Sequence, residues 1–414
     1  MRKLIASIVL SLTIGSVQSQ NNWNWNQYHY FADSNFTSGG AWGSINYHIL
    51  SNHLTNELTN QVVFDGKVLP YATEFIDEYA SSGYTMMSAG SVGEVWVRPG
   101  NNKKWRPIFG LGYRDVATAT LKTGLVQHYL RGNGPYEDEE IDLGPSELSY
   151  HSYQFFGVGL EHTSDKTQWG ATAQLIKSSR YAQLSMGSSS IYTAPFGSSI
   201  EADLNFRYDY TSTEQGKLGA WYGTGYSINA FFQHQANTNG ALINFQLRDF
   251  GQIFYEGINR WKLNDSLTFN GLEANNILQL DDSLVNGGEL DSLEALLGLQ
   301  RAHPFRRVGM PVSIQVNYAH PIGKRSSINV QLRQFLTFGL PEFRVGFVYR
   351  PQPWIAFEPT IRAGGMSRVD LGLSVAINAG NRFLLLLKTE QFENLVAPDR
   401  STSQYLSLAT QLKF

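Results

Sequence analysis

The chain ends in a stretch, Leu406–Phe414, in which apolar side chains alternate with small or polar ones. Successive side chains of an extended strand point to opposite faces, so one face of this stretch is apolar up to the final aromatic. The apolar face carries Leu406, Leu408, Leu412 and Phe414, and the polar face carries Ser407, Gln411 and Lys413. This pattern is typical of the closing strand of an outer-membrane β-barrel. We therefore expect the barrel-assembly machinery to recognise the chain through the strand that ends at Phe414.

The other end of the chain has the pattern of a secretory signal peptide. Met1–Lys3 is positively charged, Leu4–Ile14 is apolar, and Ser16–Ser19 offers a small-residue cleavage site. Residues 1–19 are therefore expected to be removed, so that Gln20 begins the mature chain. The apolar run is too short to cross a bilayer as a helix, which takes about 20 residues. No other run in the sequence reaches that length, so we expect the membrane to be crossed by strands.

Composition narrows the class of partner and of chemistry. The absence of cysteine excludes disulfides, thiolate metal sites and cysteine nucleophiles. A net charge of -3 gives no reason to expect nucleic acid as a partner. Aromatic residues make up 13% of the chain and glycines number 39. These values fit a barrel with aromatic side chains at both membrane interfaces and glycines at turns and bends.

Many segments share the two-residue alternation, and Ile200–Tyr210 is the clearest of them. The C-terminal third repeats it in Ser326–Phe338, Phe343–Tyr349 and Val369–Asn378. Such strands are longer than the ~5–6 residues of a globular strand and match the ~9–11 of a membrane strand. Further candidates include Trp105–Asp115, Ala119–Arg131, Gln168–Ser178, Tyr181–Ile191, Asn239–Phe250 and Gln252–Trp261. We predict an all-β fold, a transmembrane antiparallel up-and-down β-barrel of about 14–18 strands, with residues 20–414 as one domain.

Two segments break the alternation and are expected to be non-strand inserts, at about residues 51–83 and 262–306. Tyr71–Tyr79 and Glu289–Leu297 have helical spacing, and the second places Leu290, Leu293 and Leu297 on one stripe. We expect a short helical insert that acts as a plug, a cap or a docking element. Counting strands from a periplasmic C-terminus puts the second insert outside the cell. The same count puts the long loop 132–145 on the periplasmic side, which indicates one miscounted strand.

The sequence yields no catalytic, cofactor or metal site, and the chain is predicted not to be an enzyme. Its nine histidines are scattered, and the neighbours His151 and Ser152 would point to opposite faces of a strand, so they cannot act as base and nucleophile. The acidic run Glu137–Glu140 with Asp142 could bind Ca²⁺, but we favour a solvated loop. The polar strand faces carry both positive and negative side chains. Such residues can line an open channel or form internal salt bridges, and the sequence does not distinguish the two. These residues are Arg207, Arg248, Arg333, Arg344, Glu201, Asp203, Asp209 and Asp370.

A family resemblance rests on Gly110–Tyr113, Gly124–Val126, Leu130–Tyr136 and Ile191–Gly197. In this order the segments resemble an uncharacterised family of Bacteroidota outer-membrane barrels, a domain of unknown function distantly similar to fatty-acid-transporter-like barrels. The resemblance implies a fold and a location, and it supplies no binding residues. The Asn-Pro-Ala-Tyr opening of type IX secretion accessory barrels is absent from the sequence, which disfavours that assignment.

Two functions follow as expectations for an integral protein of the bacterial outer membrane. The first is a non-enzymatic accessory or scaffold subunit of an outer-membrane protein assembly, for secretion or barrel insertion. The alternative is a channel, either a passive pore or a fatty-acid-transporter-like conduit for small molecules. The expected partners are outer-membrane lipid and lipopolysaccharide, the barrel-assembly machinery through Phe414, and other outer-membrane proteins or lipoproteins. Nucleic acid and cofactors are not expected.

Overall fold

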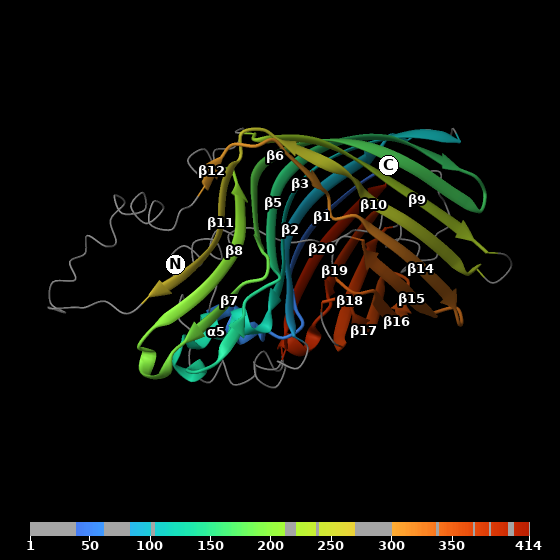
Figure 1. Cartoon of the computed structure of the whole chain (residues 1–414). Coiled ribbons are helices and arrows are strands. Elements are labelled where there is room, and N and C mark those ends of the chain that lie inside the picture. Colours follow the sequence, from blue (N-terminus) through green and yellow to red (C-terminus); the bar gives the residue numbers. More distant parts are fainter. Residues whose placement is uncertain are drawn as a thin grey trace.

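Fourteen antiparallel strands close into a barrel in the computed structural model (Figure 1). The structure describes residues 39–61, 83–100, 104–211, 221–236, 240–269, 300–336, 339–366, 369–380, 382–395 and 401–413. The wall consists, in order, of β1 (Gly40–Ser51), β2 (Tyr84–Arg98), β3 (Trp105–Lys122), β5 (Ser146–Thr163), β6 (Thr167–Met186), β9 (Gly223–Gln235), β10 (Leu242–Tyr255), β14 (Ser313–Pro321), β15 (Ser326–Phe335), β16 (Glu342–Gln352), β17 (Ile355–Gly364), β18 (Val369–Ala379), β19 (Phe383–Thr389) and β20 (Ser403–Lys413). β20 pairs with β1 along its length. The predicted fold class is confirmed, at the lower end of the expected strand number.

The strands place apolar side chains outside the barrel and polar ones inside it. On β20, Leu406 and Leu412 are 60% and 49% exposed, whereas Ser407 is 2% exposed. A soluble β-protein would bury the leucines and expose the serine. The reverse arrangement is stable only where the outer surface meets lipid. The faces expected for the C-terminal strands are therefore confirmed, with the apolar face outermost.

Exposed aromatic side chains gather at both ends of this apolar outer surface. Near the short turns they are Trp105, Trp169, Phe232, Tyr318, Tyr349 and Trp354, and near the long connections they are Tyr113, Trp221, Tyr226, Phe250 and Phe305. Two histidines lie with the first group. The ring centroid of His162 is 4.8 Å from that of Trp105, and the ring centroid of His320 is 6.1 Å from that of Tyr318. Aromatic rings at two levels match the two interfaces of a bilayer. The described residues include no helix long and apolar enough to cross a membrane.

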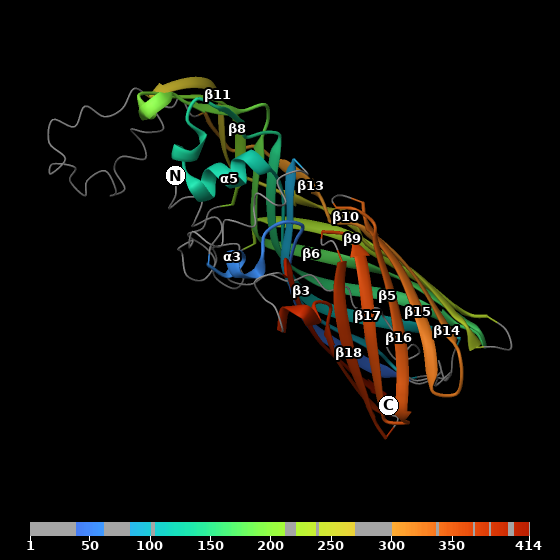
Figure 2. The same ribbon diagram turned by 90° about the horizontal axis from the view of Figure 1, so that it is seen from below.

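All long connections leave the barrel at one end, which also carries the shorter connections between β15 and β16 and between β17 and β18, whereas the other end carries only short turns (Figure 2). The segment Ala119–Arg131, predicted as one strand, is divided: its first residues complete β3, and Thr123–Arg131 forms helix α5. Gly132, with φ 75°, ends the helix and donates its N–H to the carbonyl of His128. This correction removes the miscounted strand. It places residues 132–145 at the same end as the other long connections.

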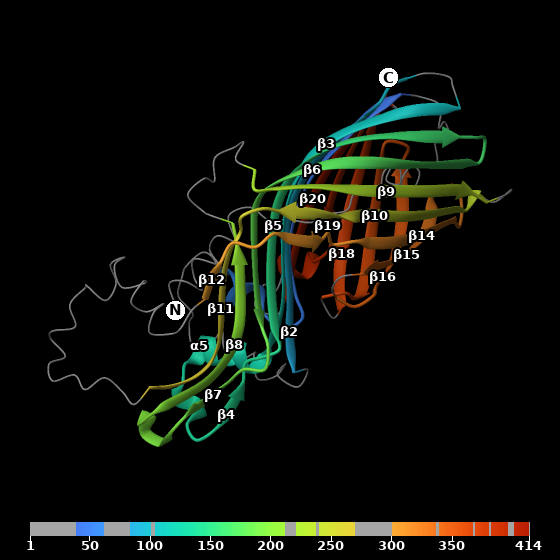
Figure 3. The same ribbon diagram turned by 45° about the horizontal axis from the view of Figure 1, so that its top comes forward.

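Several long strands continue beyond the barrel, where further strands join the same sheet and form a part called here the extension sheet (Figure 3). Gln168–Ser178 and Tyr181–Ile191 are predicted as separate strands, but β6 runs through the first and continues to Met186 in the second. A register shift opposite Ser152 and Tyr153 takes the place of a turn, and the last residues of the second segment belong to β7. Past this shift β6 pairs with β8, followed by β7 and β4 on one side and β11 and β12 on the other. The bounds of the added strands are β4 (Glu140–Asp142), β7 (Ser190–Thr193), β8 (Ile200–Tyr210), β11 (Asn259–Phe269) and β12 (Gln300–Ala302). Ile200–Tyr210 is therefore a strand of the extension sheet and not of the barrel wall.

The expected inserts are only partly non-strand. The first begins with helix α3 (Asn56–Asn60), whose first turn is capped by the Thr55 side chain. The second begins within β11 and ends with β12 and the first residue of β13 (Arg306–Gly309), so the prediction of a non-strand segment is wrong for residues 262–269, 300–302 and 306. The predicted strand Gln252–Trp261 is likewise divided at Gly257, whose φ of 65° turns the chain from β10 into β11. The signal peptide 1–19, Tyr71–Tyr79, Glu289–Leu297 with Leu290, Leu293 and Leu297, and Phe414 lie outside the described residues.

The two ends of the barrel can be assigned to the two sides of the membrane with single cysteines. Because the chain has no native cysteine, a thiol at Ser198, in the extension, or at Gly323, in the turn between β14 and β15, reacts without background. We expect Ser198→Cys to be labelled on intact cells by a membrane-impermeant maleimide. Gly323→Cys should react only after the outer membrane is permeabilised. Labelling in the opposite order would show that the extension faces the periplasm.

Candidate functional site

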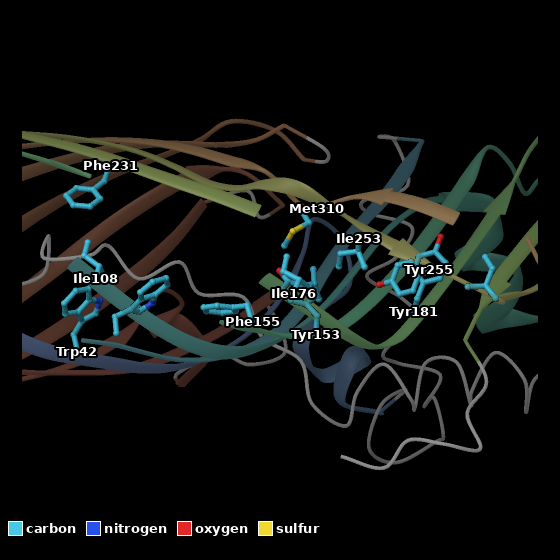
Figure 4. Packing of buried hydrophobic residues seen from close by; sticks show 13 residues of the cluster. Trp42, Ile108, Tyr153, Phe155, Ile176, Tyr181, Phe231, Ile253, Tyr255 and Met310 are labelled. Carbon is cyan, nitrogen blue, oxygen red and sulfur yellow. The ribbon is translucent and has the colours of Figure 1, made fainter. Parts of the chain in front are cut away.

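One half of the inner wall carries a connected cluster of buried apolar and aromatic side chains, called here the apolar lining. It extends along the barrel from Trp42, Ile108 and Phe231 at one end to Tyr181 and Tyr255 at the other (Figure 4). Its members are Trp42, Trp96, Ile108, Val116, Tyr153, Phe155, Ile176, Tyr181, Phe231, Ile253, Tyr255, Ile258 and Met310. A barrel wall in lipid requires apolar residues only on its outer face. Apolar residues on the inner face therefore need a separate explanation.

The rings of this lining lie against the wall because glycines face them. A Cβ atom on Gly110 would come within 2.1 Å of the Trp96 ring, and one on Gly157 within 2.8 Å. Phe155 occupies the space over Gly112 in the same way, at 2.6 Å. The Trp96 and Phe155 ring centroids are 5.8 Å apart. The glycines thus make the aromatic rings a surface layer of the wall instead of side chains that project across the lumen.

A β-bulge in β10 points two consecutive charged residues into the lumen. The register against β9 shifts between Leu247 and Phe250, and Asp249 has a positive φ of 58°. Its N–H donates to the Asn229 side chain at 2.7 Å. In a regular strand Arg248 and Asp249 would face opposite sides, but the extra residue of the bulge turns both inward. Both side chains are buried, at 3% and 1% exposure.

These two residues form ion pairs with the facing wall, a set called here the cross-lumen bridge. Arg114 of β3 pairs with Asp249, and Arg248 pairs with Glu94 of β2 at 3.1 Å. Arg114 also lies 3.3 Å from Glu94. Since β5, β6 and β9 separate β3 from β10 in the wall, the pairs cross the interior. The bridge is neutral and buried, so removing one partner should cost about 3–5 kcal/mol of stability.

The other half of the lumen, along β15 to β19, is filled by a second ion-pair network. Arg333 pairs with Glu342 at 2.5 Å and Arg344 with Glu358 at 3.1 Å, and the remaining pairs are similar. The full set is Arg333, Arg344, Arg362 and Lys388 with Glu342, Glu358, Asp370 and Glu390. Equal numbers of both signs leave no net charge that would select ions. Of the two arrangements left open by the sequence, an open channel or internal salt bridges, the structure shows internal salt bridges for Arg248, Arg333, Arg344 and Asp370. Arg207, Glu201, Asp203 and Asp209 lie in the extension sheet.

His151 and Ser152, the remaining candidates from the sequence, each contact a different neighbouring side chain. Ser152 Oγ lies 3.0 Å from Ser179 Oγ, while the His151 ring packs on Tyr181 with centroids 5.3 Å apart. The two neighbours are thus not paired, as predicted. Among the described residues there is no group of three or more His, Asp or Glu side chains that could hold a metal ion. The prediction that the chain is not an enzyme stays a prediction.

The acidic run Glu137–Glu140 contacts the hairpin formed by β7 and β8. Glu137 accepts the N–H of Phe196 at 3.1 Å, and Asp138 accepts the hydroxyl of Tyr192 at 2.8 Å. Asp142 pairs with Lys122 at 3.1 Å. These contacts fix the tip between β7 and β8 to the segment before β4. Residues 137–140 are exposed, as expected of a solvated loop, and part of the run also supports the Phe196 tip.

A groove of about 620 Å³ lies on the outer wall over Gly43 and Gly93, next to exposed Ile45, Val95 and Leu111. It faces the bilayer, so lipid acyl chains are its expected occupants. No sequence pattern predicts this groove, because a glycine on the lipid face of a strand has no distinctive signature. The apolar lining was missed for a related reason: Val95, Trp96 and Val97 form an apolar run in which inner and outer positions look alike.

The chain is similar to several solved structures. They include the Pseudomonas putida toluene transporter TodX, at 8% identity and a TM-score of 0.45, with 98% of this chain and 97% of that chain covered. A Pseudomonas aeruginosa FadL homologue has 10% identity and a TM-score of 0.44, with 97% and 99% covered. The translocator domain of the autotransporter NalP from Neisseria meningitidis has 8% identity and a TM-score of 0.35, with 92% and 90% covered. A comparison with curated proteins gave no match.

The family resemblance can be checked independently of these structures. The expected membership of an uncharacterised family is confirmed, while the Bacteroidota origin stays a prediction. The model of the family of unknown function DUF5723 matches residues 31–387, and the chain belongs to that family.

Proposed function

We propose that the chain is a gated conduit that passes small, largely apolar molecules through the bacterial outer membrane. The observation that carries the proposal is the apolar lining, in which Trp96 and Phe155 lie flat on inner-wall glycines. A conduit for apolar solutes needs an apolar surface along its length. A barrel that serves only as a scaffold has no need to keep aromatic rings out of its lumen.

A passive aqueous pore is a poorer account of the same interior. Such a pore has polar side chains that face a wide water-filled channel. Here the inward side chains Asn244, Asn317 and Glu358 are at most 1% exposed. The cavity beside His48, Glu342 and Tyr405 measures about 20 Å³, which is room for one water molecule. The cross-lumen bridge closes the interior between β3 and β10, so passage requires that ion pairs or rings move aside.

The test measures uptake of a small apolar dye, such as N-phenyl-1-naphthylamine, into cells that express the chain. Gly110→Val should displace the Trp96 ring into the lumen and lower the uptake rate. A displaced ring that adds ~1.4 kcal/mol to the barrier for passage would lower the rate roughly tenfold. Trp96→Ala should raise the rate. Gly93→Val is the matched control, because a Cβ there faces outward and meets nothing within 4 Å.

Uptake by the native chain no faster than in cells without it would contradict the conduit. Equal uptake rates in the native chain and in Trp96→Ala would also contradict it. The Trp96→Ala variant tests the apolar lining even if Gly110→Val does not assemble. A sugar of similar size serves as the polar comparison. It should enter no faster with the chain than without it.

A second candidate, an accessory subunit that docks a partner protein, is favoured by the Phe196 tip. Phe196 is 95% exposed and has φ 60° and ψ 19°, a left-handed backbone conformation that is strained for a bulky residue. Such strain costs about 1–3 kcal/mol, and the hydrogen bond to Glu137 helps to hold it. An exposed ring held next to acidic residues 137–140 fits a partner with an apolar pocket and a basic rim.

This candidate is tested by co-purification from native membranes. Phe196→Ser should lose a partner that the native chain retains. Ile322→Ser, which removes a 56% exposed apolar side chain at the short-turn end, should keep it. If native, Phe196→Ser and Ile322→Ser chains recover the same proteins, the tip is not a docking element.

A further inference from the structure

Three arginines, two of the extension sheet and one of the short strand β13 (Arg306–Gly309) that pairs with β10, converge on one buried carboxylate. Asp209 of β8 is 0% exposed, and Arg260 of β11 donates to it twice, from Nε at 2.6 Å and from Nη2 at 2.9 Å. The Nε atoms of Arg207 and Arg306 each lie 3.6 Å from Asp209 Oδ2. One negative charge is thus surrounded by three positive charges, which leaves an excess of two.

Nearby charged groups preserve this excess. Lys262 lies opposite Arg207 in the register of β8 and β11 and is exposed. Glu147 of β5 accepts a hydrogen bond from Gln183, and its one negative charge is equal in number to the one positive charge of Lys262. The hydrogen bond from Arg260 to Asp209 raises the pKa of Arg260 further above its ordinary value. A guanidinium group is in general charged at physiological pH.

The guanidinium groups are accessible from solvent, although the carboxylate beneath them is not. The side chains of Arg207, Arg260 and Arg306 are 37%, 24% and 23% exposed. Only part of their hydrogen-bonding capacity is used, because each guanidinium has five N–H donors. In the described part of the chain, Arg306 donates to Gln183 at 2.7 Å, and Arg260 donates to Asp209. The remaining outward N–H groups can meet a ligand.

The cluster lies where the lumen opens into the extension. Gln183, directly opposite Asp209 in the register of β6 and β8, accepts the Tyr181 hydroxyl at 2.7 Å. Tyr181 in turn stacks on Tyr255, with centroids 4.6 Å apart, at the end of the apolar lining. A ligand held by the arginines would therefore lie at the long-connection mouth of the barrel.

We infer that Arg207, Arg260 and Arg306 form a binding site for a doubly charged phosphoryl group. A phosphate monoester carries about -1.5 to -2 charges at neutral pH, which matches the excess of two, whereas one carboxylate would leave a positive charge uncompensated. Planar guanidinium groups pair with phosphate oxygens through two parallel hydrogen bonds. The site goes beyond the proposed conduit, because its occupancy can be measured without any transport.

The test uses the purified full chain in detergent and isothermal titration with inorganic phosphate. Saturable binding is expected, weakened by on the order of tenfold in Arg207→Gln and in Arg306→Gln, since each loses a charge-assisted contact. Asp209→Asn should bind phosphate more tightly than the native chain, because the competing carboxylate charge is gone. Arg325→Gln, an exposed arginine in the β14–β15 turn, is the matched control and should titrate like the native chain.

A second arm separates a free phosphate ester from a lipid headgroup as the source of the group. Vesicles that contain lipid A are compared with vesicles that contain dephosphorylated lipid A, and heat-modifiable migration confirms that each variant is folded. Preference for the phosphorylated vesicles that is lost in Arg306→Gln supports a lipid source, and binding of free phosphate alone supports a soluble ester. If the native chain binds neither, or if both arginine variants bind like the control, the cluster is a purely structural ion-pair group and the inference is overturned.

Discussion

The structure depends on the pairing of β20 with β1, which leaves no strand edge in the barrel wall. In hydrocarbon a backbone N–H or C=O without a partner costs several kcal/mol, so a sheet in a membrane has to close on itself. Closure fixes which face of every strand meets lipid and which meets the lumen. The outward leucines of β20, the aromatic residues at both ends of the wall and the inward polar side chains all follow from it.

The same closure creates an electrostatic problem inside the barrel. Charged residues that face the lumen leave bulk water, so each needs a partner of opposite sign. Along β15 to β19 this is achieved by four cations and four anions. Between β2, β3 and β10 it is achieved by the bulge at Asp249, which lets the two walls meet. The apolar lining lies beside these pairs, and its glycines keep the rings close to the wall. The combination of a neutral bridge with an apolar surface is what the proposed conduit requires.

Local periodicity was enough to predict most of the wall, because strands such as β16 and β18 alternate strictly and end at turn residues. It failed where one segment fits two structures. Thr123–Arg131 continues the β3 sequence without a break, and only Gly132 signals the end of a helix. The junction within β6 has the pattern of a turn, because the sequence does not distinguish a turn from a continuous strand that carries one extra residue, here Ser179.

The candidate site was less predictable because it depends on long-range pairing. Arg207 and Asp209 were recognised as polar residues of one strand face, but their meeting with Arg260 and Arg306 depends on the order of β8, β11 and β13 (Arg306–Gly309). Arg248 and Asp249 are adjacent charges in a strand, which is a bulge signal that simple alternation overlooks. Glu94 and Arg114, their partners, lie far from them in the sequence. Their meeting follows from the three-dimensional course of the barrel and not from local pattern.

The central claim is that the cross-lumen bridge keeps the barrel closed to ions. Single-channel recording of the purified chain in planar bilayers tests it most directly, with the native chain compared to the variant that combines Glu94→Gln with Asp249→Asn. The native chain should show no steady conductance. The variant leaves Arg114 and Arg248 without counter-charges, so the two cations should repel each other and produce discrete conductance steps. Steady conductance of the native chain, or a variant as silent as the native chain, would contradict the account.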